Sequence, residues 1–268
     1  MTPLFSLSVG TAGPRVAFLH GLFGQGRNWM QIAKGVAGQH GLDARCLLVD
    51  LPDHGRSPWS TEFSFEAYAA AVAATLTATA PGEQWTVVGH SLGGKVAMVL
   101  ALAHPEVVER LAVVDIAPRH YGNLERFEGY IEEMQALPLA ELISRADAEA
   151  RFDEPDPGVK AFLLQNLRRD GQAWRWQANL SLVAADAARG SGSLIADWPV
   201  AAGDHPAYDG PVLWVAGGES RYIGMQDAPV MSALFPRVRK LTVKGAGHWV
   251  HTDAPDIVVA ALRRFVAT

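Results

Sequence analysis

The chain has a single cysteine, Cys46, among its 268 residues. One cysteine cannot form an internal disulfide, so the sequence lacks the disulfide framework of small secreted domains. Cys46 lies in the apolar run 46–49, where we expect it to fill the core as a small apolar side chain.

Long apolar runs are also absent. The alanine-rich segment 67–76 is too short for a membrane span and contains Tyr68. The first residues, 1–5, lack the basic region and apolar stretch of a secretory signal. We therefore expect a cytoplasmic protein that has no membrane partner.

Positive charge is in the minority in this sequence. Lys and Arg number 23 against 28 Asp and Glu, which gives a formal net charge of −5. Basic residues are dispersed apart from the short pairs Arg168-Arg169 and Arg263-Arg264. This balance argues against nucleic acid as a main partner. With 49% hydrophobic and 19% charged residues, the composition and length favour one large α/β domain with an insertion.

Short apolar runs alternate with helical patterns along most of the chain. The runs are residues 15–19, 45–49, 85–88, 110–114, 212–215 and 240–243. They are continuous rather than alternating, as in strands buried on both faces. One of the helical patterns between them spans residues 65–79, with Ser64 as its N-cap. The order predicts an α/β fold with a mostly parallel, doubly wound sheet, whose site gathers at the carboxyl ends of the strands.

The pattern changes between residues 119 and 198, which we predict to be an inserted helical cap. This stretch shows no clear strand and favours helices near residues 121–137, 139–152, 159–167 and 174–188. It is too long for a loop without structure of its own. The α/β core would then comprise residues 1–118 and 199–268, with the cap placed over the site.

Gly89-His90-Ser91-Leu92-Gly93 stands between the apolar run 85–88 and a helical pattern at residues 95–103. Gly-x-Ser-x-Gly between a strand and a helix is the nucleophile-elbow pattern. Such a tight turn holds its central residue in a strained conformation and leaves no space for side chains at the flanking positions. A phosphate loop ending in Gly94-Lys95 is the alternative, but Val96 stands where that loop needs Ser or Thr.

A serine nucleophile needs a base beside it, and the base needs a carboxylate that orients it. His248 follows the last apolar run on a glycine-rich loop and lies downstream of Ser91, which fits the chain order Ser, acid, His. His251 is the alternative base. A metal site at His248, His251 and Asp253, or at Asp53-His54, lacks enough ligands at metal spacing, so we expect no metal or other cofactor.

Five motifs together resemble the α/β-hydrolase superfamily over the whole chain and, within it, the bacterial YbfF-type esterases. They are His20-Gly21-Leu22-Phe23-Gly24, His54-Gly55-x-Ser57-Pro58, Gly89-His90-Ser91-Leu92-Gly93-Gly94-Lys95, Asp115-Ile116-Ala117-Pro118 and Gly245-Ala246-Gly247-His248-Trp249-Val250-His251. The resemblance implies the α/β-hydrolase fold and hydrolysis of carboxylic esters or thioesters, on a small-molecule acyl substrate and without a cofactor. Other triad chemistry remains open: C–C bond hydrolysis, acyl transfer, perhydrolysis, or a receptor with little turnover.

The triad acid is where the sequence departs from the superfamily pattern. In the superfamily the acid usually lies three residues beyond the glycine that ends the strand after the cap. Counted from Gly217 this position is Ser220, and counted from Gly218 it is Arg221, so neither count gives an acid. Asp115, which ends the preceding apolar run, is the acid that we prefer. Glu219 is the alternative, although it is out of step with the usual slot.

The oxyanion hole of such an enzyme needs two preorganised N–H donors. We expect one from Leu92, directly after the nucleophile, and the other from Leu22 in the loop after the first buried run. Phe23 is the alternative second donor and an expected substrate contact. His20 and His90, which flank this region, are expected to be structural hydrogen-bonding residues.

Aromatic residues of the predicted cap are candidates for substrate binding. Trp174 and Trp176, together with Phe162-Leu163-Leu164, would line an acyl pocket. The alternative is that these side chains form a small core of the cap itself.

Overall fold

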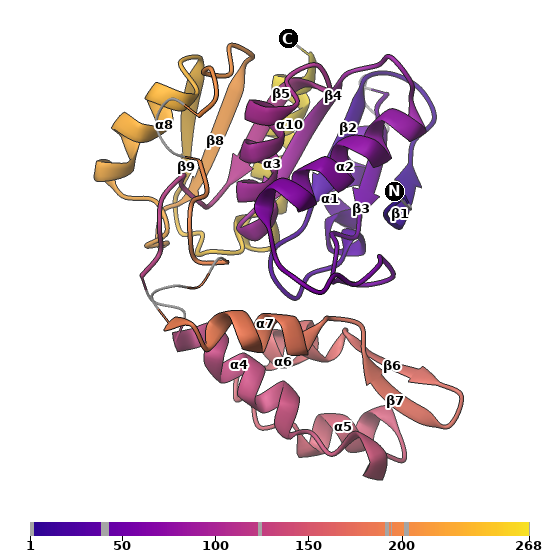
Figure 1. Cartoon of the computed structure of the whole chain (residues 1–268). Helices are drawn as coiled ribbons and strands as arrows, with labels where there is room; N and C mark the ends of the chain where they lie inside the picture. Colours follow the sequence, from indigo (N-terminus) through magenta and orange to yellow (C-terminus); the bar gives the residue numbers. More distant parts are fainter. Residues whose placement is uncertain are drawn as a thin grey trace.

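The computed structural model describes residues 3–38, 43–122, 125–190, 193, 195–200 and 204–267. The strands of its central sheet are β1 (Ser6–Val9), β2 (Arg15–Leu19), β3 (Arg45–Val49), β4 (Trp85–His90), β5 (Val108–Val114), β8 (Val212–Gly217) and β9 (Val238–Val243). They form a seven-stranded sheet in the order β1-β3-β2-β4-β5-β8-β9 (Figure 1). β1 is antiparallel to β3 and all other neighbours are parallel, which confirms the predicted mostly parallel sheet.

Helices cover both faces of this sheet. They are α1 (Met30–Ala37), α2 (Phe65–Thr79), α3 (Leu92–Ala103), α8 (Ala228–Leu234), α9 (Val250–Asp253) and α10 (Pro255–Ala267), with the 3₁₀ turns η1 (Gly26–Trp29) and η4 (Met225–Asp227). The Ser64 hydroxyl accepts a hydrogen bond from the Ala67 N–H at 3.2 Å, which confirms the predicted N-cap of α2. None of the helices in the described ranges has the length and apolarity that crossing a membrane requires.

Side chains alternate along the strands between two hydrophobic cores. In β2, Val16 and Phe18 join the core with α1 and α10, whereas Ala17 and Leu19 join the core with α2 and α3. Both faces of the sheet are therefore buried, which explains why its inner strands are continuous apolar runs. Cys46 lies buried in the core of α1 and α10, and burial raises the pKa of its thiol to about 12.

The segment between β5 and β8, which we call the insertion, forms a separate layer across one end of the sheet (Figure 1). It contains α4 (Glu125–Ala136), η2 (Leu139–Glu141), α5 (Arg145–Arg151), α6 (Pro157–Leu164), β6 (Leu167–Asp170), β7 (Ala173–Trp176) and α7 (Leu180–Ala187). Two amides join it to the loops that follow β2 and β3. Asn166 Nδ2 donates to the Phe23 carbonyl at 2.8 Å, and Asn179 Nδ2 donates to Asp53 Oδ1 at 2.7 Å.

The insertion contains the expected helices, α4 to α7, but the prediction that it has no strand is wrong. β6 and β7 pair as an antiparallel hairpin, and the two residues between them are Gly171 and Gln172. Gly171 has a φ of 61°, a conformation that two-residue hairpin loops require and that glycine adopts without strain. Trp174, which we expected at the start of a helix, lies on β7, and the last helix begins only at Leu180.

Buried histidines hold the loops at the carboxyl ends of the strands. His20 Nε2 accepts a hydrogen bond from the Leu51 N–H at 2.9 Å, so its proton lies on Nδ1, which donates to the Gly21 carbonyl at 2.8 Å. Burial lowers the pKa of His20 to about 3 and also lowers the pKa of His54 and His90. These rings are therefore neutral in the folded chain at neutral pH.

The neutral state of His20 makes the free energy of unfolding depend on pH. In the unfolded chain its pKa returns to about 6.5, so below that pH the unfolded state binds a proton that the folded state excludes. The free energy of unfolding should therefore fall as the pH drops from 6.5 toward 3, by up to about 1.4 kcal/mol per pH unit for this residue. His20→Gln keeps a hydrogen-bond donor and an acceptor but cannot titrate. It should therefore reduce the difference in bound protons between the unfolded and folded states by about one, and the slope becomes correspondingly flatter.

Urea unfolding of the wild type and of His20→Gln at several pH values between 4 and 7 measures the two slopes. His104→Gln is the matched control, because His104 lies near the protein surface with a side chain 35% exposed. Its slope should equal that of the wild type. Equal slopes for the wild type and His20→Gln would show that His20 does not account for the loss of stability in acid.

Candidate active site

Ser91 lies in a tight turn between the end of β4 and the start of α3. Its φ of 53° and ψ of −119° are the strained conformation of a nucleophile elbow. A Cβ added at Gly89 would lie 2.1 Å from the Gly93 carbonyl oxygen, and one added at Gly93 would lie 2.5 Å from that of His20. Only glycine fits at either flank, so the Gly-x-Ser-x-Gly spacing follows from the close approach of backbone to backbone.

Lys95, the residue behind the phosphate-loop alternative, is buried on α3 behind this turn. Its ammonium group donates to the carbonyl oxygens of Ala196 at 2.8 Å and Asp197 at 2.5 Å. Burial lowers the pKa of Lys95 to about 7. The lysine therefore holds the end of the insertion against the elbow helix through protein carbonyls, where a phosphate loop would direct it at a phosphate.

The structure brings Asp115 and His248 together at the carboxyl edge of the sheet. His248 follows β9, Asp115 follows β5, and His248 Nδ1 lies 2.8 Å from Asp115 Oδ2. Since Nδ1 is engaged by the carboxylate, Nε2 is the ring nitrogen that remains for other chemistry. His248 and Ser91 line the same cavity. The backbone at Asp115 has a φ of 50°, so the carboxylate and the serine both sit on strained turns.

The Asp115 carboxylate is fully buried and its oxygens accept hydrogen bonds from two further groups. Gly217 N–H donates to Oδ1 at 2.9 Å, and the Ser220 hydroxyl donates to Oδ2. Ser220 occupies the usual acid slot of the sequence pattern, and here it supports the carboxylate from the neighbouring strand end. Glu219, the alternative acid, is exposed, and its N–H donates to the Ala246 carbonyl at 2.9 Å.

Tyr222 is a contact of the site that sequence reasoning missed. Its ring stacks on the His248 imidazole with centroids 3.8 Å apart and planes 18° apart. The Tyr121 hydroxyl donates to the Tyr222 carbonyl at 2.7 Å and so fixes the backbone beneath this ring. Nothing in the sequence around Tyr222 marks it, because its role depends on how the loop after β8 folds over His248.

The other histidines near Ser91 do not contact Asp115. His90 Nε2 donates to the His248 carbonyl at 2.9 Å, which fits the expected structural role. His251, the alternative base, stacks on the Trp29 ring at 4.4 Å, and burial lowers its pKa to about 3. Within the described ranges, no three His, Cys, Asp or Glu side chains gather closely enough to hold a metal ion.

The two expected oxyanion donors belong to separate segments near Ser91: Leu92 follows it in the chain, and Leu22, in the loop after β2, lines the same two cavities. Leu92 is the first residue of α3, and the first N–H groups of a helix have no partner inside it. Leu22 lies in the loop braced by His20, where the Gly24 N–H donates to the Gly21 carbonyl at 2.9 Å. Phe23, the alternative donor, has a φ of 59°, and its carbonyl accepts from Asn166.

Two cavities meet at Ser91. The larger, about 260 Å³, contains His248 and is walled by aromatic side chains of the core and of the insertion. These are Phe23, Trp29, Phe127, Tyr130, Phe162, Tyr222 and Trp249. The smaller, about 40 Å³, is also lined by Ser91 but not by His248, and it shares Leu22, Phe127 and Tyr222 with the larger one. Its lining also includes Lys95, Ile116, Tyr121, Ile195 and Ala196.

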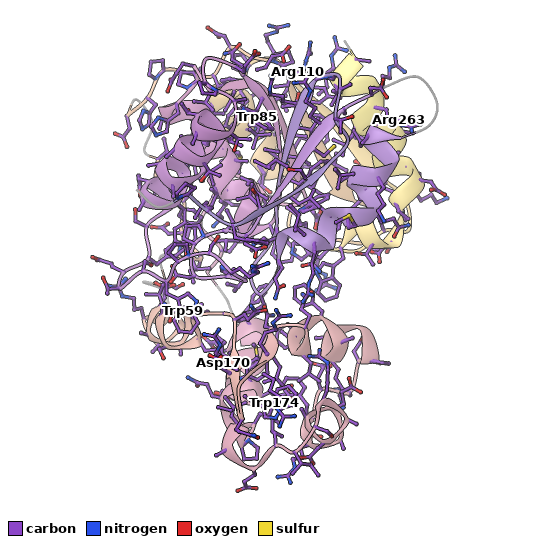
Figure 2. The ribbon with its side chains drawn as sticks, turned by 90° about the vertical axis from the view of Figure 1, so that its right-hand side faces the viewer. Trp59, Trp85, Arg110, Asp170, Trp174 and Arg263 are labelled. Atoms are coloured by element: carbon purple, nitrogen blue, oxygen red, sulfur yellow. The ribbon has the colours of Figure 1, made fainter. Side chains whose placement is uncertain are left out.

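Trp174 and Trp176 line neither cavity, which corrects the expectation that they line an acyl pocket. Figure 2 shows Trp174 within the insertion. Trp176 is buried, and its indole N–H donates to the Met134 carbonyl at 3.0 Å. The Trp174 indole donates to the Leu142 carbonyl at 2.9 Å. Both rings pack within the insertion because the hairpin turns them toward α4 and the turn before α5. Phe162 alone of the expected cap residues reaches the larger cavity.

Known proteins resemble this chain in sequence over most of its length. A family described as alpha/beta hydrolase fold matches residues 14–255. The sn-1-specific diacylglycerol lipase ABHD11 of Mus musculus is 35% identical over 260 residues, covering 95% of this chain and 81% of that protein. Esterase YbfF of Escherichia coli (strain K12) is 31% identical over 255 residues, covering 94% of this chain and 92% of that protein.

Solved structures show the same fold over nearly the whole chain. A structure titled Marine microorganism esterase superposes with a TM-score of 0.90 at 28% sequence identity, covering 98% of this chain and 99% of that one. The family match, the related lipases and esterases and this superposition show that the chain belongs to the α/β-hydrolase family.

Proposed function

We propose that this chain is a serine hydrolase that cleaves carboxylic esters or thioesters through Ser91, His248 and Asp115. The observation that carries the proposal is the 2.8 Å contact between His248 Nδ1 and Asp115 Oδ2, beside a serine on a strained elbow. A serine hydroxyl becomes a nucleophile when an oriented imidazole can take its proton. The related esterases and lipases support the same class of reaction.

In the first half of the reaction, the Ser91 oxygen attacks the carbonyl carbon of the substrate and its proton passes to His248 Nε2. Asp115 keeps the His248 proton on Nδ1 and stabilises the imidazolium that forms. The hydrogen bonds from Gly217 and Ser220 fix the carboxylate for this task. His248 then gives its proton to the leaving alcohol or thiol, and the acyl group remains on Ser91.

The N–H groups of Leu92 and Leu22 would stabilise the negative oxygen of each tetrahedral intermediate. They lie on separate, rigid backbone segments, the start of α3 and the loop that His20 braces. Donors fixed in advance need no reorganisation when charge develops, which makes this type of contact effective. Water, deprotonated by His248, then attacks the acyl-enzyme carbonyl and releases the carboxylic acid.

Covalent labelling tests the nucleophile directly. A fluorophosphonate probe should add its mass to the peptide that contains Ser91, and Ser91→Ala should abolish labelling and lower kcat for a chromogenic ester by at least about 10⁴-fold. His248→Gln should also abolish labelling, whereas the matched variant His251→Gln should keep it. Labelling on another serine, or loss in the His251 variant alone, would contradict the assignment.

The same geometry assigns the two cavities to different parts of the substrate. His248 must donate its proton to the leaving group, so the leaving group lies on the side of Ser91 that faces His248. That side is the larger cavity of about 260 Å³. The acyl chain then occupies the smaller cavity of about 40 Å³, which is lined by Ser91, Ile116 and Ile195 but not by His248. We therefore propose a short acyl group and a larger alcohol or thiol.

In this assignment the insertion, with the boundaries 119–198 proposed as a cap domain, sets substrate choice on both sides of Ser91. Phe162 of α6 lines the leaving-group side, and Ile195 closes the acyl side. Phe127 of α4 borders both. Substitutions at Phe162 and Ile195 should therefore change different specificities, whereas Trp174 and Trp176 should change neither.

Esters of one alcohol with acyl chains of increasing length test this assignment. The wild type should prefer butyrate to octanoate in kcat/KM, and Ile195→Ala should raise the octanoate-to-butyrate ratio by about tenfold, because a few methylene groups gain space. Phe162→Ala is the control on the other side. It should leave that ratio unchanged and alter the preference among alcohols in a set of butyrate esters. If the wild type has equal kcat/KM for octanoate and butyrate, the acyl chain must lie in the larger cavity instead, which would contradict the assignment.

A further inference from the structure

Away from the two cavities at Ser91, a concavity of about 470 Å³ lies where the core meets the hairpin of the insertion. Its walls come from the loop after β3, with Arg56 and Trp59, and from β6 and β7, with Arg168, Arg169 and Arg175. None of the residues that line it lines the cavity that contains Ser91 and His248. Figure 2 shows Trp59 at the edge of the core that faces the insertion.

Positive charge is concentrated in this concavity although the whole chain carries a net charge of −5. Arg168 and Arg175 stand directly opposite each other in the β6–β7 register, an arrangement that destabilises a hairpin when both charges are alike. Arg175 forms an ion pair with Asp170 at 3.3 Å. Among the residues that the structure describes, Arg56, Arg168 and Arg169 form no ion pair with a carboxylate.

The guanidinium groups are positioned by aromatic rings. Arg56 lies over the Phe5 ring at 4.0 Å, and Arg169 lies over the Trp174 ring at 5.7 Å. Stacking of this kind uses the face of the guanidinium and leaves the N–H groups at its edges to donate to acceptors. One such group, Arg169 Nη2, donates to Gln172 Oε1 at 3.5 Å, a long contact that an anion can replace.

Trp59 adds an apolar surface to this charged wall. It is 55% exposed, an unusual state for a large ring that has the option of packing against the core. An exposed indole face offers a stacking surface to a planar ring. Arginine binds phosphate oxygens in a two-pronged geometry, so the two features together suit a ligand that joins a phosphate to an aromatic ring.

We propose that Arg56, Arg168, Arg169 and Arg175, with Trp59, form a binding site for an organic phosphate that carries a planar ring, of the nucleoside diphosphate kind. The phosphates bind between Arg168, Arg175 and Arg56, where they remove the repulsion across the hairpin, and the ring stacks on Trp59. Bound there, the ligand joins the core loop to the hairpin of the insertion. The site is separate from Ser91, so its occupancy does not depend on the reaction proposed for that residue.

Titration calorimetry with ADP, pyrophosphate and adenosine as separate ligands tests this site, at physiological salt and with the full-length chain. ADP should bind at one site. The double variant Arg168→Gln with Arg175→Gln should weaken ADP and pyrophosphate binding by on the order of tenfold or more, since charge-assisted contacts are lost. Trp59→Ala should weaken ADP binding and leave pyrophosphate binding unchanged. Arg264→Gln, an exposed arginine on α10, is the matched control and should bind ADP like the wild type.

The binding is measured in parallel with the Ser91→Ala protein, which should bind ADP unchanged whether or not Ser91 is a nucleophile. The substituted side chains Trp59, Arg168, Arg175 and Arg264 are all exposed, so these variants should melt like the wild type, and their melting temperatures are measured alongside binding. Absence of saturable ADP binding at millimolar concentration would overturn the proposal, as would equal affinity in the double arginine variant. Binding to vesicles that contain anionic lipid, without any binding of ADP, would overturn it in favour of a membrane surface.

Discussion

The hydrogen bond between Asp115 and His248 depends on the order of the strands. It also constrains which residues can stand at the end of β8 and in the loop that follows it. Asp115 follows β5 and His248 follows β9, so the bond passes across the end of β8, which lies between them. β8 ends in Gly217, where an added Cβ would lie 2.2 Å from the Gly247 carbonyl oxygen, and the Gly217 N–H donates to the carboxylate. The site therefore requires a strand end without a side chain, and Ser220 completes the support from the following loop.

Features that depend on local constraints could be predicted from the sequence. The apolar runs 15–19 and 45–49 coincide with β2 and β3, because a strand buried on both faces must be apolar throughout. The elbow at Ser91 could be recognised from its two flanking glycines. Gly89 is required by the nearby Gly93 carbonyl, and Gly93 is required by the carbonyl of His20 in the adjacent loop. Asp115 could be named as a candidate acid because it ends a buried run, whereas its contact with His248 required the folded chain.

Features that depend on contacts between distant segments could not be predicted in the same way. Trp176 reads as a pocket residue in the sequence, yet its indole binds the Met134 carbonyl inside the insertion. Tyr222 has no motif around it, and it matters because its ring stacks on His248. The β6–β7 hairpin has a local signal, Gly171 as the first of its two loop residues, but the helical pattern around it predicts a different structure. The pairing of Arg168 with Arg175 becomes visible only once this hairpin is known.

The central claim is that the carboxylate at the end of β5 orients His248, and the kcat of two amide variants tests it most directly. Asp115→Asn should lower kcat for a chromogenic ester by about 10²- to 10⁴-fold, because the amide can neither fix the tautomer nor stabilise the imidazolium. Glu219→Gln is the matched variant, and because Glu219 is exposed, kcat should change by less than about tenfold. Both proteins should melt like the wild type. A crippled Glu219→Gln enzyme beside an active Asp115→Asn enzyme would contradict the account.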